Sequence, residues 1–60
     1  MPDTYIEEAM FSRTNVVVYT TNGYQIRCCI VHEADNYIVV LSSGKKKMIY
    51  KHAISTIEPA

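Results

Sequence analysis

The sequence contains no long apolar segment. Its longest uninterrupted apolar run covers only residues 37–41, and residues 16–19 form a shorter one, whereas a helix that crosses a membrane needs about 20 apolar residues. The first residues also lack a basic leader followed by an apolar stretch, so no secretory signal is visible. We therefore expect no membrane partner and a cytoplasmic location.

The chain also lacks an excess of either charge. Its 6 Lys and Arg residues balance 6 Asp and Glu residues, which counts against a partner that is held by bulk charge alone. The distribution is uneven, however. Residues 1–43 carry a net charge of −3 (two basic against five acidic residues), and residues 44–60 carry +3 (four against one). Positive charge is therefore concentrated near the C-terminal end.

The patterns that mark catalytic, metal and cofactor sites are missing as well. The two cysteines, Cys28 and Cys29, are adjacent, so in a strand they point to opposite faces and cannot hold one metal ion. Together with His32 and His52 they do not make a zinc set. No Gly-rich phosphate loop or strained nucleophile turn is present. We expect no metal, no cofactor and no enzymatic activity, and the thiols suit a reducing compartment.

What the chain does contain is a pattern for a helix followed by short strands. Its 60 residues leave room for one domain, residues 1–60, and its 48% apolar composition is typical of a globular protein. Ile6, Ala9 and Met10 recur at helical spacing and predict a helix over about residues 4–12.

Runs of β-branched and aromatic residues predict strands at about 16–21, 24–30, 37–41, 47–51 and 54–57. Asn22-Gly23 predicts a hairpin with a type I′ turn. Residues 42–46 predict a loop, so the lysines at 45–47 are either solvated there or form a phosphate-contacting edge. We expect a strongly bent sheet that closes towards a barrel and whose unpaired edges favour self-assembly.

Residues 50–56, with the sequence YKHAIST, resemble the second signature of the bacterial Sm-like RNA chaperone family Hfq. Residues 35–41 resemble its first signature, and the resemblance extends over about residues 3–59. It implies a mostly β protein in which an N-terminal helix precedes a five-stranded, strongly bent antiparallel Sm-like barrel. It also implies that the barrels assemble into a homohexameric ring, with one subunit's fourth strand against the next subunit's fifth.

The resemblance implies that one face of the ring, the proximal face, binds U-rich single strands around the pore. Lys51 and His52 match pore residues that contact base and phosphate, and Tyr37 matches a stacking aromatic beside Asn36. Copies of Lys51 and His52 around one pore would form a positive funnel. Pro2 stands where the family commonly has glutamine, so we expect weaker uridine selectivity.

The opposite, distal face is implied to bind A-rich strands, with Tyr19 stacking on an adenine. The other positions that match its purine pockets are Gly23, Tyr24, Gln25, Ile26, Arg27, Lys47 and Thr56. Gln25 stands where lysine is common, and Arg27 where glutamine is common. The span from Gly23 to Asp35 is also one residue longer than in familiar relatives, which leaves the register of residues 30–35 open.

The rim of the ring carries an arginine cluster in some relatives, and this chain has only Arg13 there. We therefore expect poor annealing of two RNAs. The leading hypothesis is an RNA chaperone ring that supports post-transcriptional regulation by small RNAs. The alternative is an Sm-like ring with decayed RNA contacts, which acts as a scaffold for protein partners.

Overall fold

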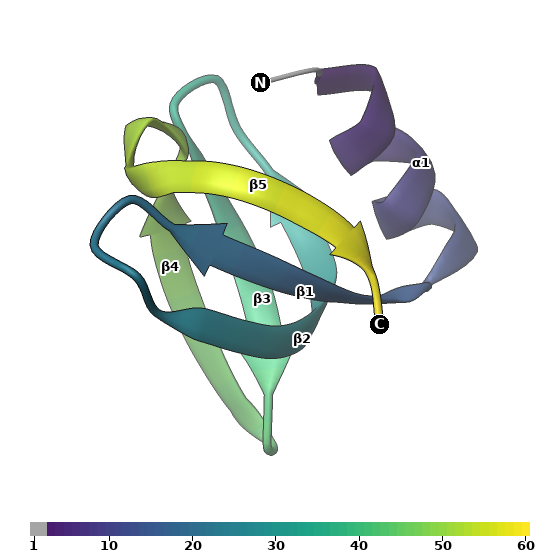
Figure 1. Ribbon diagram of the computed structural model, residues 1–60. Coiled ribbons are helices and arrows are strands. Elements are labelled where there is room, and N and C mark those ends of the chain that lie inside the picture. Colours follow the sequence, from purple (N-terminus) through teal and green to yellow (C-terminus); the bar gives the residue numbers. More distant parts are fainter. Residues whose placement is uncertain (1–2) are drawn as a thin grey trace.

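The computed structural model describes residues 3–60 (Figure 1). The elements, in chain order, are α1 (Asp3–Ser12), β1 (Asn15–Thr20), β2 (Gln25–Glu33), β3 (Tyr37–Ser42), β4 (Lys45–Tyr50), the 3₁₀ turn η1 (Lys51–Ala53) and β5 (Ile54–Pro59). The predicted helix and its five following strands are therefore confirmed. Pro2, a predicted difference from the family, lies outside the described residues.

The helix α1 ends where Arg13 adopts a left-handed conformation with φ of 54°. The Arg13 amide donates to the Met10 carbonyl at 3.3 Å, and the Thr14 amide donates to the Ala9 carbonyl at 3.1 Å. This pair of bonds is the Schellman arrangement, which normally places glycine at the left-handed position. An arginine there is strained, because its Cβ crowds the backbone.

The strands form one antiparallel sheet in the order β4-β3-β2-β1-β5. Figure 1 shows how strongly this sheet is bent and that α1 lies to one side of it. In the described chain, β4 and β5 are the two edges and do not pair with each other. Each edge therefore leaves backbone donors and acceptors free for another strand.

The core lies between α1 and the inner side of the bent sheet. It is small, as expected of a chain of this length, and its fully enclosed side chains are aliphatic: Ile6, Val16, Val18, Ile30, Ile38 and Val40. Strand alternation explains the pattern, because Val16 and Val18 point inward while Val17 and Tyr19 belong to the opposite side. We call that opposite side of β1, β2 and β5 the outer face.

The hairpin predicted at Asn22-Gly23 is confirmed, but its predicted turn type is wrong. Among residues 3–60, only Arg13 and Ser43 are non-glycine residues with positive φ. Asn22 therefore lacks the conformation that a type I′ turn requires. The Thr20 amide instead donates to Tyr24 at 2.9 Å, and the Gly23 amide to Thr20 at 3.1 Å. This three-residue loop ends on Gly23, with φ of 97°.

The type I′ geometry occurs in the other hairpin, where Ser43 and Gly44 have φ of 53° and 78°. Ser42 pairs directly with Lys45 across this two-residue turn. The predicted 42–46 loop is therefore too long. The three lysines lie in a strand and not in a loop, but they are solvated, as one of the two interpretations expected. All three lysines, Lys45 to Lys47, lie in the edge strand β4 and are exposed.

Strand β2 contains a β-bulge between Ile30 and His32. Ile30 pairs with Val40, and His32 pairs with Val39, so Val31 has no partner of its own in β3. A bulge absorbs one additional residue while both flanking registers are kept. This geometry settles the register that the sequence left open.

The ends of the last two strands also differ from the prediction. The fourth strand ends at Tyr50, because Lys51–Ala53 form one turn of 3₁₀ helix. The fifth strand continues to Pro59, which pairs with Val16. Proline is tolerated there because β5 is an edge strand, whose outward side needs no amide donor.

Candidate functional site

The outer face presents a regular grid of side chains around Tyr19. Tyr19 in β1 is the direct partner of Gln25 in β2 and of Thr56 in β5. Directly paired residues in antiparallel strands project from the same side of the sheet. The structure therefore brings together three of the side chains that were predicted for the distal site.

A second row of the grid runs parallel to the first, two residues further along β1. Val17 is its central member and pairs with Arg27 on one side and with Glu58 on the other. Arg27 was predicted from the family resemblance, whereas Glu58 was not. Period-two alternation along an edge strand would have placed Glu58 on the same face as Thr56, so that signal was present in the sequence.

Tyr19 and Glu58 are joined by a short hydrogen bond. The Tyr19 hydroxyl donates to Oε1 of Glu58 at 2.6 Å. This bond raises the pKa of the Tyr19 phenol above its usual value, because only the protonated phenol can donate a hydrogen bond to the Glu58 carboxylate. The Tyr19 ring is thereby held in one orientation on the outer face.

The remaining residues of the predicted distal set are divided by the structure. Gly23 lies in the β1–β2 turn, and the adjacent Tyr24 is 67% exposed. Ile26 instead packs against the core, as the partner of Val18. Lys47 lies in β4, at the other edge of the sheet from β5, so one chain does not bring it to Tyr19.

The predicted proximal residues gather where the β2–β3 connection meets η1. The Lys51 amide donates to the Asn36 carbonyl at 2.9 Å. Tyr37 pairs with Tyr50, and the His52 ring stacks on Tyr50 with centroids 5.5 Å apart and planes 17° from parallel. The structure therefore brings Asn36, Tyr37, Lys51 and His52 into one neighbourhood, as predicted.

The Lys51 ammonium is held by two carboxylates of its own chain. Its Nζ donates to Oε2 of Glu33 at 3.0 Å and to Oδ1 of Asp3 at 3.2 Å. The Lys51 and Glu33 side chains are only 13% and 11% exposed. The hydrogen bond to Glu33 is the main reason why the pKa of Lys51 is raised above its usual value.

A polar cavity of about 300 Å³ surrounds this ammonium, and we call it the Lys51 pocket. Its lining consists of Asp3, Glu7, Glu33, Ala34, Asp35 and Lys51. Four carboxylates therefore face one ammonium. A single chain therefore has an excess of negative charge around Lys51, whereas a positive funnel was expected from several copies around a pore.

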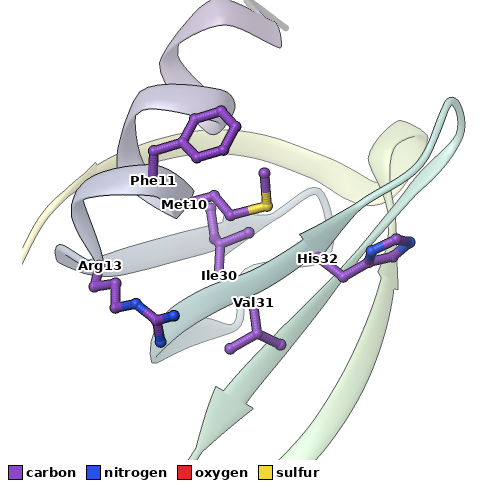
Figure 2. Close-up of a pocket in the computed structure, with 6 residues that line it drawn as sticks. All are labelled: Met10, Phe11, Arg13, Ile30, Val31 and His32. Atoms are coloured by element: carbon purple, nitrogen blue, oxygen red, sulfur yellow. The ribbon is translucent and has the colours of Figure 1, made fainter.

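A third surface lies between the end of α1 and the bulge of β2, and we call it the rim groove (Figure 2). It encloses about 360 Å³ and is lined by Met10, Phe11, Arg13, Ile30, Val31 and His32. Phe11 is 80% exposed. Within residues 3–60, the Arg13 side chain makes no hydrogen bond or ion pair shown by the structure. The predicted rim residue thus stands beside the exposed Phe11 ring, in a groove of mixed polarity that sequence reasoning missed.

Residues 3–60 contain neither a metal-binding cluster nor a membrane-spanning helix. In this range, no three His, Cys, Asp or Glu side chains are grouped to hold a metal ion. Neither of the free cysteines faces the other, since Cys28 is buried while Cys29 is partly exposed. No helix in the same range is long and apolar enough to cross a membrane.

A short helix before a strongly bent, five-stranded antiparallel sheet defines an Sm-like fold. The family model described as Hfq protein matches residues 1–60. The RNA-binding protein Hfq of Clostridium kluyveri is 48% identical over 61 residues, which cover 100% of this chain and 73% of that protein. The chain belongs to the Hfq family.

Two further relatives agree with this assignment. The RNA-binding protein Hfq of Clostridium botulinum (strain Hall) is also 48% identical over 61 residues, covering 71% of that protein. A crystal structure of the pleiotropic translational regulator Hfq superposes with a TM-score of 0.88 at 36% identity, covering 92% of each chain. This similarity confirms the predicted mostly β, Sm-like fold.

Proposed function

We propose that this protein is an RNA chaperone that assembles into a homohexameric ring and binds single-stranded RNA on two faces. The observation that carries the proposal is the outer face, where the Tyr19 ring is fixed by Glu58 and flanked by Gln25, Thr56 and the cationic Arg27. Aromatic platforms beside positive charge are the usual means of holding unpaired bases. The relatives' names, which describe RNA-binding proteins, support the same conclusion.

The two free sheet edges support ring assembly. In the described chain, β4 and β5 are both unpaired on their outer sides, and pairing β4 of one copy with β5 of the next would close a ring without open edges. The same pairing would bring Lys47 of one copy near Tyr19 and Thr56 of its neighbour. The distal set of side chains is thus completed only between copies.

Sedimentation tests this dependence on assembly. The protein is mixed with a fluorescent oligo-A, and absorbance and fluorescence are followed together over a range of protein concentrations. The expected result is that the label sediments only with the hexamer. A folded monomer that carries the oligonucleotide would contradict the proposal.

The two faces are proposed to bind different RNAs. A-rich strands would stack on Tyr19 of the outer face, and U-rich strands would contact Asn36, Tyr37, Lys51 and His52. Tyr19→Ala should weaken oligo-A binding and spare oligo-U, whereas Lys51→Ala should do the reverse. Phe11→Ala is the matched control, because the exposed Phe11 ring lines the rim groove and belongs to neither face. Equal losses of both oligonucleotides in either variant would contradict separate faces.

The biological role that we propose is post-transcriptional regulation by small RNAs in the cytoplasm, without chemical catalysis. A ring that holds two strands raises their local concentration. The rim groove carries a single arginine, so acceleration of annealing should be small. The rate of duplex formation by two complementary RNAs, with and without the protein, measures this acceleration. A large acceleration would show that the rim promotes annealing without an arginine cluster.

The rim groove supports a second candidate function, the scaffold for a protein partner. Exposed aromatic and aliphatic side chains beside an arginine are typical of protein-binding hot spots. The lining contains the basic side chain of Arg13 and no carboxylate. The matching occupant is therefore a peptide segment that places an apolar side chain next to a carboxylate.

Peptide display against the assembled protein tests this second function. Enriched peptides should combine apolar and acidic residues, and their binding should be lost in Phe11→Ala and kept in Tyr19→Ala. Enrichment of peptides without that combination, or binding that survives Phe11→Ala, would contradict it. Loss of RNA binding in Phe11→Ala would assign the groove to RNA instead.

A further inference from the structure

We propose that Glu58 selects the base that stacks on Tyr19, by accepting a hydrogen bond from an exocyclic amino group at the edge of that base. The inference rests on the proposed function, because it requires that the outer face binds RNA. It adds a specificity residue that the family resemblance, which singles out residues 50–56 of this segment, does not include.

The geometry of the Tyr19 ring is the first step. Thr56 is the direct partner of Tyr19 in β5, so Glu58 is its diagonal neighbour, two residues further along the strand. A hydroxyl that reaches this diagonal position, at 2.6 Å from Glu58, requires the ring to lie along the sheet. Val17 lies between them on the outer face and is only 6% exposed. One face of the ring is therefore turned to the sheet, and the other is available for stacking.

The hydrogen-bonding capacity of Glu58 is the second step. A carboxylate has two oxygens and about four acceptor sites, and Tyr19 uses one of these sites on Oε1. Within residues 3–60, the structure shows no donor to Oε2. A free carboxylate oxygen at the rim of a stacking platform can accept a hydrogen bond from the edge of a stacked base.

The chemistry of the bases then sets the preference. Adenine and cytosine carry an amino donor at the position where uracil carries a carbonyl acceptor. A carboxylate at this position favours the amino group and repels the carbonyl. Arg27 lies across Val17 from Glu58 in the same row and offsets the carboxylate's repulsion of RNA phosphates. Glu58 therefore favours adenine and cytosine over uracil without making the face negative.

The test uses two oligonucleotides that differ only in this amino group. One is a short oligo-A, and the other has purine riboside, which lacks the 6-amino group, in place of adenosine. For the wild-type ring, removal of the amino group should weaken binding on the order of 10-fold, as expected for a hydrogen bond to a charged acceptor. In Glu58→Val the two oligonucleotides should bind within about 2-fold of each other, because no acceptor remains.

Glu58→Gln is the second variant. Its amide oxygen still accepts a hydrogen bond, so it should retain an intermediate preference for the amino group. An equal loss on amino removal in the wild type and in Glu58→Val would overturn the inference while leaving the proposed function intact. Failure of the wild-type ring to bind either oligonucleotide would instead overturn the proposed function, and the inference with it. Sedimentation of each variant confirms that the ring is assembled.

Discussion

The outer face and the Lys51 pocket each combine a carboxylate with a side chain that we propose binds RNA, with opposite consequences. On the outer face, Oε1 of Glu58 accepts a hydrogen bond from the Tyr19 hydroxyl at 2.6 Å. This bond fixes the Tyr19 ring and leaves one face of the ring open for stacking. In the Lys51 pocket, Glu33 and Asp3 form ion pairs with the Lys51 ammonium at 3.0 and 3.2 Å. These pairs compensate the positive charge that would otherwise attract a phosphate. A carboxylate thus orients an aromatic ring for stacking, but it competes with RNA phosphates for a cation.

A residue that matches the family pattern therefore does not by itself make a matching binding site. Lys51 and Tyr19 are equally consistent with the family pattern, yet their neighbours in the chain differ. We therefore expect the outer face to be the stronger RNA site of this protein.

Glu33→Gln should strengthen oligo-U binding by roughly 10-fold, because an ammonium released from a carboxylate is available to a phosphate. Binding should also become more sensitive to salt, by about 0.7 in the logarithmic slope for each phosphate contact that is gained. Oligo-A binding on the outer face should not change. Fluorescence anisotropy at several salt concentrations measures all three quantities.

The control for this prediction combines the change with Lys51→Met. If Glu33 acts by holding Lys51, then Glu33→Gln should have a much smaller effect in the Lys51→Met background. An undiminished gain would show that Glu33 repels RNA directly and does not act through the ion pair.

Arg27→Gln should weaken oligo-A binding by a few-fold and lower its salt dependence, because the outer face loses its cation beside Glu58. Oligo-U binding in the Lys51 pocket should be unaffected. Gln25→Ala is the matched control, since it removes a neutral neighbour in β2 and should leave the salt slope unchanged. A salt slope for oligo-A that is unchanged in Arg27→Gln would count against the role of Arg27.

Arg13→Gly should raise the free energy of unfolding by about 1 kcal/mol, because glycine adopts the left-handed conformation without a steric penalty. The observed φ of 54° at the end of α1 is the cause of the expected gain. Affinities for oligo-A and oligo-U should not change, because Arg13 lies outside both sites. Chemical denaturation measures the stability, and a loss of stability would show that the Arg13 side chain contributes contacts of its own.

Alkaline pH should weaken the Lys51 pairs, with a small effect on stability. The pKa of Lys51 is raised in the folded chain above its usual 10.5, so the pairs contribute fully below pH 10.5 and are lost as the pH rises through the folded pKa. In Glu33→Gln, which lacks the main cause of the raised pKa, this alkaline loss should be smaller. Thermal unfolding at pH values from 9 to about 12 provides the comparison.

The fold was predictable from the sequence because its signals are local. The apolar stripe of residues 6, 9 and 10 and the β-branched runs each require only a few neighbouring residues, and all of them produced the expected elements. The turn types were harder to predict. Asn22-Gly23 carries the stronger type I′ signal, but the two-residue turn formed at Ser43-Gly44, because the register of β3 and β4 fixes the loop length there.

The side-chain partners were not predictable, because they are distant in the sequence. Tyr19 and Glu58 are 39 residues apart, Lys51 and Asp3 are 48 residues apart, and Lys51 and Glu33 are 18 residues apart. Such pairs depend on the bend of the sheet and on the bulge in β2, neither of which has a clear local signal. The family resemblance grouped several residues that lie together in the structure, but it did not show which charges are already compensated.

The most direct test of this account compares oligo-A and oligo-U of equal length on the wild-type protein at one salt concentration. We predict that oligo-A binds more tightly, that Tyr19→Ala removes this advantage, and that oligo-U remains the weaker ligand until Glu33 is replaced. Tighter binding of oligo-U by the wild-type protein, with no effect of Tyr19→Ala on oligo-A, would contradict the account.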